Sequence, residues 1–375
     1  MALTFVHTAD WQLGKSFGFL PDDQGVVLQR ARDEIVERVA GIAHQAGAPL
    51  AVVAGDVFDG EDPPEVRVRQ ILTRLAGAAP LTWHLLPGNH DPARAGGIWD
   101  TVRRIGVPAN VHLHLTPSTA EIVPGYHLLP APLVAKSSSS DPTLWMDAAA
   151  TPEGHVRVGL AHGSIQGFGS LGEASVYIDP ARARRAGLAY LALGDWHGLK
   201  EIAPSTWYSG TPEPDSFADN DPGHVLVVTL DGGPARVTPV ASGQFRWLSR
   251  EIKAERLTDL ARLEADIAAT PDTVRNWLVE LRLTGRLPAS ALGNIEARLQ
   301  VLSGRLFALR TDRRGLRLGT SQDDIGALGS AFARQIAERL KPVIDGADET
   351  AARRASRALE LLIAIDGELS ERQAT

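Results

Sequence analysis

Residues 81–91 run Leu-Thr-Trp-His-Leu-Leu-Pro-Gly-Asn-His-Asp, an apolar segment that passes directly into the polar stretch Gly88–Asp91. Taken alone, that stretch is an ordinary turn, because glycine, asparagine and aspartate are common turn residues. The question is whether this loop only reverses the chain or also carries chemistry. The rest of the sequence answers it, since the same transition from apolar segment to polar loop recurs.

Four further loops have this character, and each follows a predicted strand. They are Asp10-Trp-Gln12, Gly55-Asp-Val-Phe-Asp59, Ala161-His-Gly163 and Gly194-Asp-Trp-His197. The early strands alternate with segments of helical periodicity, predicted as helices over residues 24–46 and 64–78. Functional sites of α/β sheets lie at the carboxyl ends of strands, so the pattern predicts an α/β fold whose loops converge on one site.

Composition narrows the class of protein. The chain has 375 residues, with 44% apolar and 22% charged, which is typical of a globular protein with room for two domains. No segment has the ~18 consecutive apolar residues of a membrane-spanning helix, and the start of the chain does not resemble a signal peptide. The absence of cysteine excludes disulfides and thiolate metal sites and favours a cytoplasmic location. The net charge of −7 neither supports nor excludes a phosphate-bearing substrate, because bound cations change the local sign.

The pattern of predicted helices and strands changes near residue 245. A helix is predicted over residues 251–269, strands over 277–283 and 305–309, and a helix over 290–302. Together they indicate a small α/β module from about 250 to 312. Residues 325–371 follow as a mostly helical segment, in which the apolar stretch Ala355–Ile365 is a candidate interface or a local core.

Together, the five loops resemble the motifs of the calcineurin-like metallophosphoesterases. Three longer stretches resemble the SbcD-type DNA repair exonucleases, including their YhaO branch: HTADWQLGK at 7–15, GDVFDGEDPP at 55–64 and YSGTPEPDSF at 208–217. The resemblance implies a β-sandwich flanked by helices, with a nuclease domain at 1–245 and a small α/β capping domain at 246–318. It also implies a helical segment at 319–375 that docks on an SMC-like ATPase of the SbcC/YhaN type, and possible homodimers.

The resemblance further implies a centre of two divalent metal ions bridged by Asp56. Asp10, position 12 and His197 would complete the first site. Asn89, His162 and position 195 would complete the second.

The remaining family position concerns catalysis, and two ligand positions depart from the family pattern. His90 matches the histidine that assists the leaving oxygen. Gln12 and Asp195 stand where the family usually has histidine. Oxygen ligands therefore dominate, which favours Mn²⁺, or Mg²⁺, over Zn²⁺. Gln12 is either a direct ligand or a support for one, and the alternative for both positions is that metal binding has decayed.

Three functions are consistent with these residues. The first is a metal-dependent DNA exonuclease or endonuclease acting in DNA repair with an ATPase subunit. The second is a phosphodiesterase for small molecules, and the third is a scaffold subunit with a weakened metal site.

Some residues near the motifs have two interpretations. Trp11 and Trp196 either stack on a base or wall the site. The basic run Arg182, Arg184 and Arg185 either contacts DNA phosphates or forms a solvated helix face. Asp59 is interpreted as structural, and residues 164–170 as a loop beside the site.

Overall fold

The computed structural model describes residues 2–166, 176–253, 258–269, 274–288, 292–319, 325–326 and 328–374. The predicted loop at 164–170 therefore lies partly outside the described residues. The chain divides into two compact units. The first comprises residues 1–215 and 220–245, and the second comprises residues 216–219 and 246–375.

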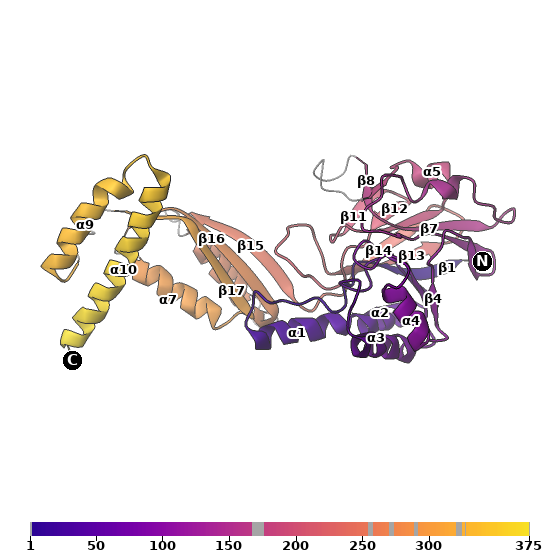
Figure 1. Cartoon of the computed structure of the whole chain (residues 1–375), viewed down its shortest axis with the longest axis horizontal. Helices are drawn as coiled ribbons and strands as arrows, with labels where there is room; N and C mark the ends of the chain where they lie inside the picture. The colour runs from indigo at the N-terminus through magenta and orange to yellow at the C-terminus, as the bar shows by residue number, and fades with distance from the viewer. Residues whose placement is uncertain are drawn as a thin grey trace. The chain divides into compact units, whose positions relative to one another are not determined.

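Two six-stranded mixed sheets form the first unit (Figure 1). The first sheet has the order β14-β13-β1-β2-β3-β4: β14 Arg236–Ala241, β13 His224–Leu230, β1 Leu3–Thr8, β2 Leu50–Val53, β3 Thr82–Leu85 and β4 Val111–Leu113. The second has the order β11-β12-β10-β7-β6-β5: β11 Lys200–Ala203, β12 Thr206–Tyr208, β10 Tyr190–Gly194, β7 Val156–His162, β6 Tyr126–Ala131 and β5 Ala120–Val123. A short pair, β8 Ser164–Ile165 and β9 Tyr177–Ile178, forms a separate two-stranded sheet.

Helices cover the outer faces of the two sheets. In Figure 1, α2, α3 and α4 lie on one side of the sheets and α5 on the other. The helices of this unit are α1 Asp22–Asp33, α2 Ile35–Gln45, α3 Glu65–Gly77, α4 Ile98–Ile105 and α5 Arg182–Arg185, with a 3-10 turn η1 at Leu144–Asp147.

Each sheet packs against helices on one face and against the other sheet on its second face. Its strands are therefore apolar on both faces. Along β2, Ala51 and Val53 pack with the helices, whereas Leu50 and Val52 pack into the core between the sheets. Strands buried on both faces have continuous apolar runs rather than alternating ones, which is the pattern that made them visible in the sequence. The predicted α/β sandwich flanked by helices is confirmed.

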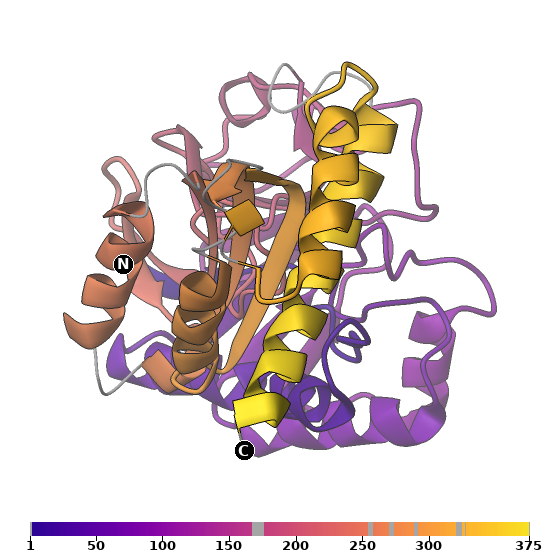
Figure 2. The same cartoon turned by 90° about the vertical axis from the view of Figure 1, so that its left-hand side faces the viewer.

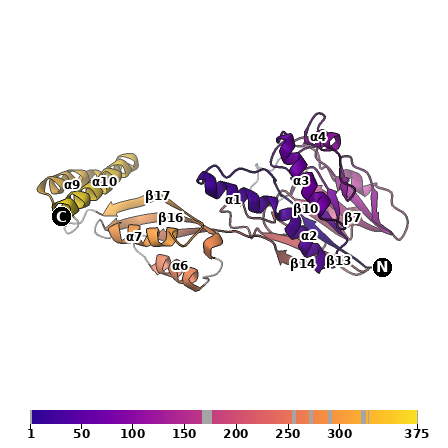
Figure 3. The ribbon, with the colours of Figure 1, turned by 90° about the horizontal axis from the view of Figure 1, so that it is seen from below.

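The second unit has a parallel three-stranded sheet, β15-β16-β17, with helices on both faces. In Figure 3, α6 and α7 lie on one side of the sheet, and α9 and α10 lie on the other. In Figure 2, α10, drawn in yellow, runs beside β17, which it contacts. The elements are β15 Arg246–Lys253, α6 Thr258–Ala269, η2 Val274–Asn276, β16 Trp277–Pro288, α7 Leu292–Ser303, β17 Ala308–Gly319, α9 Ala331–Ile344 and α10 Glu349–Ala374.

Several predicted element bounds are wrong. Residues 251–253 belong to β15 rather than to a helix, because they pair with β16 and bury Ile252. The strand predicted at 305–309 is β17, which begins at Ala308 and ends at Gly319. The prediction stopped too early because the residues from Arg310 onward include several charged ones and do not form an apolar run. The helix predicted over 24–46 is two helices separated at Glu34.

In the C-terminal segment, the stretch Ala355–Ile365 divides between core and surface. Leu359 is buried, and Leu362 and Ile363 pack against the same core, whereas Leu361 and Ile365 are exposed. The assignment of separate roles to residues 246–318 and 319–375 stays a prediction. Among the described residues, no helix combines the length and apolar character that spanning a bilayer would require.

Candidate metal centre

The five motif loops lie at the carboxyl ends of strands in both sheets. Asp10 and Gln12 follow β1, Asp56 follows β2, and Asn89 and His90 follow β3. In the other sheet, His162 ends β7, and Asp195 and His197 follow β10. The two sets meet, because the backbone N–H of Asp195 donates to Asp10 Oδ1 at 3.0 Å. The structure therefore brings together all the residues that the sequence predicted for the site.

A buried triad forms the middle of this cluster. Asp10, Asp56 and His162 offer ligand atoms that all lie within 4.8 Å of one another. His162 Nδ1 donates to the Ala54 carbonyl at 2.8 Å, which directs Nε2 to within 3.5 Å of Asp56 Oδ1. A histidine held in this way presents one defined nitrogen to a metal.

The backbone of these loops is strained. Asp10, Gln12, Asp56 and Asp195 all have positive φ angles, of 54°, 43°, 55° and 102°. Only one other described residue that is not glycine, Asp221, shares this property. Such conformations cost on the order of 1–3 kcal/mol each and gather at functional sites, where surrounding structure enforces them.

Two glycines let the loops approach closely. A Cβ on Gly55, which has φ +90°, would stand 2.2 Å from His162 Nδ1. A Cβ on Gly88 would stand 2.1 Å from Asp56 Oδ1. The glycines of the GDVFD and GNHD motifs are therefore required by packing against the site residues themselves.

The GNHD loop is positioned by its last residue. The buried carboxylate of Asp91 accepts the backbone N–H groups of Gly88 at 2.6 Å and Phe58 at 3.0 Å. Asn89 Oδ1 lies 3.0 Å from His162 Nε2. The loop at Gly88–Asp91 is therefore a turn whose side chains also belong to the candidate metal centre.

His90 lies at the exposed rim of the centre. Its backbone N–H donates to Asp56 Oδ1 at 2.9 Å, and its Nδ1 donates to the Asp59 carbonyl at 3.0 Å. Nε2 is left facing the cluster, 3.9 Å from Asp56 Oδ2. The half-exposed ring can therefore reach a substrate atom, and Asp59 acts on it through its backbone.

Gln12 is held by a residue that sequence reasoning missed. Lys15 Nζ donates to Gln12 Oε1 at 2.9 Å and to Asp215 Oδ2 at 2.6 Å. Gln12 Nε2 therefore faces the centre, 3.3 Å from Asp56 Oδ2 and 3.4 Å from His197 Nε2. An N–H₂ group cannot ligate a cation, and flipping the amide would set it against the Lys15 ammonium. The geometry supports Gln12 as a link between Lys15 and the site.

His197 also depends on residues that were not predicted. Its Nδ1 lies 3.3 Å from Asp215 Oδ1, and Asp215 accepts from Arg32 at 3.4 Å and from Lys15. Arg32 is buried and also donates to the Asp10 carbonyl at 3.1 Å. One guanidinium therefore links the Asp10 loop to Asp215, the partner of His197. Asp215 lies inside the 208–217 stretch, which was the one available signal in the sequence.

Asp195, at a position where the family usually has histidine, is held by a hydrogen bond. Its Oδ2 accepts from Ser164 Oγ at 2.6 Å, and its Oδ1 lies 3.9 Å from His162 Nε2. The carboxylate is thus oriented toward the same centre as the triad.

The charges in the centre perturb one another. Burial raises the pKa of Asp10 to about 6, against the opposing effect of His197 and His162. Burial alone would lower the pKa of His162, but the carboxylates of Asp56, Asp10 and Asp195 raise it to about 9. The three carboxylates that raise the pKa of His162 create a negative potential at its ring, which a bound cation would neutralise. The donor set therefore fits divalent metal ions.

The structure excludes one of the two interpretations of Trp11 and both interpretations of Arg182. Trp11 is fully buried, packs edge-on against Trp83 and donates to Thr8 Oγ1, so it cannot stack on a base. Arg182 is also buried and pairs with Asp141 at 2.9 Å and Asp147 at 2.5 Å. It is therefore neither a DNA contact nor part of a solvated face.

A family model described as calcineurin-like phosphoesterase matches residues 3–228, which includes every residue of the centre. The chain belongs to the calcineurin-like phosphoesterase family. Metal-dependent phosphoester hydrolysis is the activity that this membership implies. The narrower SbcD-type assignment and the ligand roles of individual residues stay predictions.

Two solved structures have weak similarity to this chain. The crystal structure of TT1561 of Thermus thermophilus is 13% identical, with a TM-score of 0.40, and the match covers 64% of this chain and all of that one. GAP50, described as the anchor in the inner membrane complex of Plasmodium, is 12% identical with a TM-score of 0.41, covering 64% of this chain and 85% of that one. No curated protein matches the sequence.

Proposed function

We propose that this phosphoesterase is a metal-dependent nuclease that hydrolyses phosphodiester bonds in DNA. The observation that carries the proposal is the convergence of the predicted side chains on one centre with His90 at its exposed rim. Asp10, Asp56 and His197 would hold one ion, with Gln12 in support. Asp56, Asn89, His162 and Asp195 would hold the other. Mn²⁺ fits this oxygen-rich set best, and Mg²⁺ is the alternative.

Two bound metal ions would supply water activated near neutral pH and neutralise charge on the phosphoryl oxygens. The residues of the chain do the remaining work. His90, with Nδ1 held by the Asp59 carbonyl, turns Nε2 toward the substrate and donates a proton to the leaving oxygen. Asp215 and Arg32 hold His197 and the Asp10 loop in place.

DNA as the substrate is supported by the motif resemblance and by a basic groove in the second unit. The groove has a volume of 540 Å³ and lies between the sheet and α10. Three carboxylates line it, and so do six arginines: Arg282, Arg310, Arg313, Arg314, Arg353 and Arg357. Ser356 also lines the groove, and its buried Oγ has no hydrogen-bond partner among the described residues. Phosphate groups of a nucleic acid would match this lining.

The SMC-like ATPase partner belongs to the same proposal. Leu361 and Ile365 lie one helical turn apart on α10 and are 50% and 55% exposed. Apolar side chains at this spacing suit a helix-to-helix contact.

Nuclease activity of the purified chain is the first test. Linear double-stranded and single-stranded DNA would be incubated with Mn²⁺, Mg²⁺ or EDTA. We expect Mn²⁺-dependent cleavage that falls on the order of 10³-fold in Asp56→Asn. Asp221→Asn is the matched control, since Asp221 is an exposed aspartate with nearly the same φ, of 56°. Cleavage of bis-p-nitrophenyl phosphate but not of DNA would favour a small-molecule substrate or a required partner.

The basic groove is tested by affinity rather than by chemistry. Arg282→Ala with Arg353→Ala should weaken DNA binding and reduce the salt dependence by about one unit of slope per arginine. Hydrolysis of bis-p-nitrophenyl phosphate should not change. An unaltered salt slope would remove the groove from the proposal.

The scaffold function has one observation in its favour, which is that Lys15 holds the Gln12 amide with its nitrogen toward the centre. Gln12→His combined with Asp195→His separates the two functions. Activity that rises from none would support the scaffold, and little change would support an active nuclease.

A further inference from the structure

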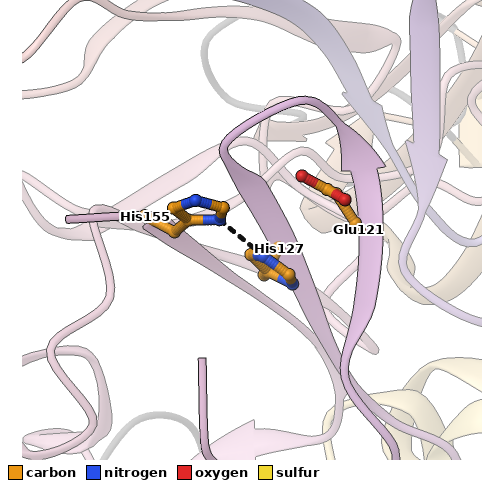
Figure 4. A group of neighbouring side chains, drawn as sticks. All are labelled: Glu121, His127 and His155. Atoms are coloured by element: carbon orange, nitrogen blue, oxygen red, sulfur yellow. Dashed lines mark hydrogen bonds between the residues drawn. The ribbon is translucent and has the colours of Figure 1, made fainter. Parts of the chain in front are cut away.

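A second histidine–carboxylate cluster lies on the second sheet, outside the family motifs. Glu121, His127 and His155 offer ligand atoms that all lie within 4.8 Å of one another (Figure 4). His127 Nε2 and His155 Nδ1 are 2.9 Å apart. The sequence offers no motif for these residues.

Strand geometry explains why the three side chains meet. Glu121 on β5 is the antiparallel partner of His127 on β6, so their side chains project from the same face. His127 is also the parallel partner of Arg157 on β7, and His155 precedes Arg157 by two positions. Because side chains alternate along a strand, His155 projects to that face as well. In Figure 4, the Glu121 carboxylate points toward the histidine pair from the neighbouring strand.

The arrangement suits a zinc ion. Two imidazoles and a carboxylate are a common Zn²⁺ donor set, and tetrahedral ligands at ~2.05 Å from the ion are separated by about 3.4 Å. The two histidine nitrogens already face each other at 2.9 Å, so a small ring rotation opens the required gap. Glu121 is anchored, since its Oε1 accepts the Gly125 N–H at 2.9 Å.

The position of this cluster separates it from the catalytic centre. His127 lies near the start of β6, and His155 lies just before β7 begins. His162 lies at the opposite end of β7, seven residues away, or roughly 23 Å along an extended strand. β5 is the edge strand of its sheet, where it lies beside β6. An ion held here would fasten β5 to β6 and to the residue that precedes β7.

We propose that Glu121, His127 and His155 form a Zn²⁺ site that clamps the β5 edge of the sheet, independently of the catalytic centre. Nothing in this proposal depends on the substrate of the enzyme. Hydrolysis of phosphoesters with Mn²⁺ should continue when the site is removed.

The test measures how many Zn²⁺ ions the full-length chain binds. Metal-free wild type, the double variant His127→Gln with His155→Gln, and the matched surface variant His44→Gln would be dialysed against Zn²⁺ and assayed by atomic emission. We expect the double variant to bind one Zn²⁺ fewer per chain than wild type, and His44→Gln to match wild type. Equal zinc content and affinity in all three proteins would overturn the proposal.

Cobalt spectroscopy gives a readout that does not depend on counting. Co²⁺ in a tetrahedral site of nitrogen and oxygen ligands has strong visible absorption. This absorption should appear in wild type and be reduced in the double variant and in Glu121→Gln. Unchanged Mn²⁺-dependent hydrolysis of bis-p-nitrophenyl phosphate shows that the variants are folded, and an unchanged Co²⁺ spectrum in them would contradict the site.

Discussion

The N-terminal unit holds two clusters of the same chemistry in opposite settings. Asp10, Asp56 and His162 are buried at the carboxyl ends of strands, and the two aspartates lie on strained backbone. Glu121 and His127 lie on a hairpin, and His155 lies beside it just before a third strand. Glu121 is exposed, His155 is half-buried and His127 is buried, and none of the three has a positive φ. Both clusters bring ligand atoms within 4.8 Å.

The difference concerns what holds each cluster together. Backbone groups, glycines and a charged network enforce the buried cluster, so it persists in spite of its own charge repulsion. Ordinary cross-strand pairing produces the edge cluster, and its histidines satisfy each other by a hydrogen bond. Enforced geometry is expected at a reacting centre, whereas a clamp requires only proximity.

Among the variants that compare the two clusters, the largest effect is expected from the glycine that makes room for His162. Gly55→Ala places a Cβ 2.2 Å from His162 Nδ1, and Gly125→Ala, beside the edge cluster, meets no atom within 4 Å. The two have similar φ angles, +90° and +85°, so backbone strain is matched. We expect Gly55→Ala to lose on the order of 10²-fold in Mn²⁺-dependent hydrolysis, as when a ligand orientation is lost.

Gly125→Ala should keep that activity, with a small fall in Tm measured by calorimetry. Equal losses of activity in both variants would show that strain alone, and not the displaced histidine, is responsible.

A smaller effect is expected from removing the partner that orients His197. Asp215→Asn keeps the size of the side chain but weakens the charged contacts to His197, Lys15 and Arg32. Mn²⁺ affinity, measured by calorimetric titration, should fall about 10- to 100-fold. Zn²⁺ bound at the edge cluster should be unaffected, and a loss at both clusters would instead indicate general destabilisation.

The metal affinity of the buried cluster should also depend on pH. His162 has a pKa raised to about 9, so a proton competes with the metal at its Nε2 below that pH. Apparent Mn²⁺ affinity should therefore increase about tenfold for each unit of increase in pH between 7 and 9. At pH values below 6 the slope should be steeper, because Asp10 also binds a proton there.

Stability of the metal-free protein should change in the opposite direction. The raised pKa of His162 stabilises the fold fully below its unfolded value of 6.5, and this contribution is lost as pH rises through about 9. Calorimetry of the EDTA-treated protein checks this, and a Tm that rises over that range would contradict the assigned charge of His162.

The sequence predicted those site residues that lie next to a predicted strand, and it did not predict those whose contacts join distant parts of the chain. Asp10, Asp56, Asn89, His162 and His197 each follow an apolar strand within a few residues, so the parallel order of strands predicts their convergence. Lys15, Arg32 and Asp215 were missed because their contacts cross the chain, joining positions up to 200 residues apart. The edge cluster was missed because sheet register, not a motif, assembles it.

The sequence by itself determined the two-sheet α/β fold and the family, because continuous apolar strands ending in glycine-containing loops are local patterns. Tertiary structure decided which polar group each side chain faces. The amide orientation of Gln12 depends on Lys15, and the burial of Trp11 and Arg182 depends on distant partners. It also decided that Glu121, His127 and His155 meet, because cross-strand pairing depends on register, which no single segment encodes.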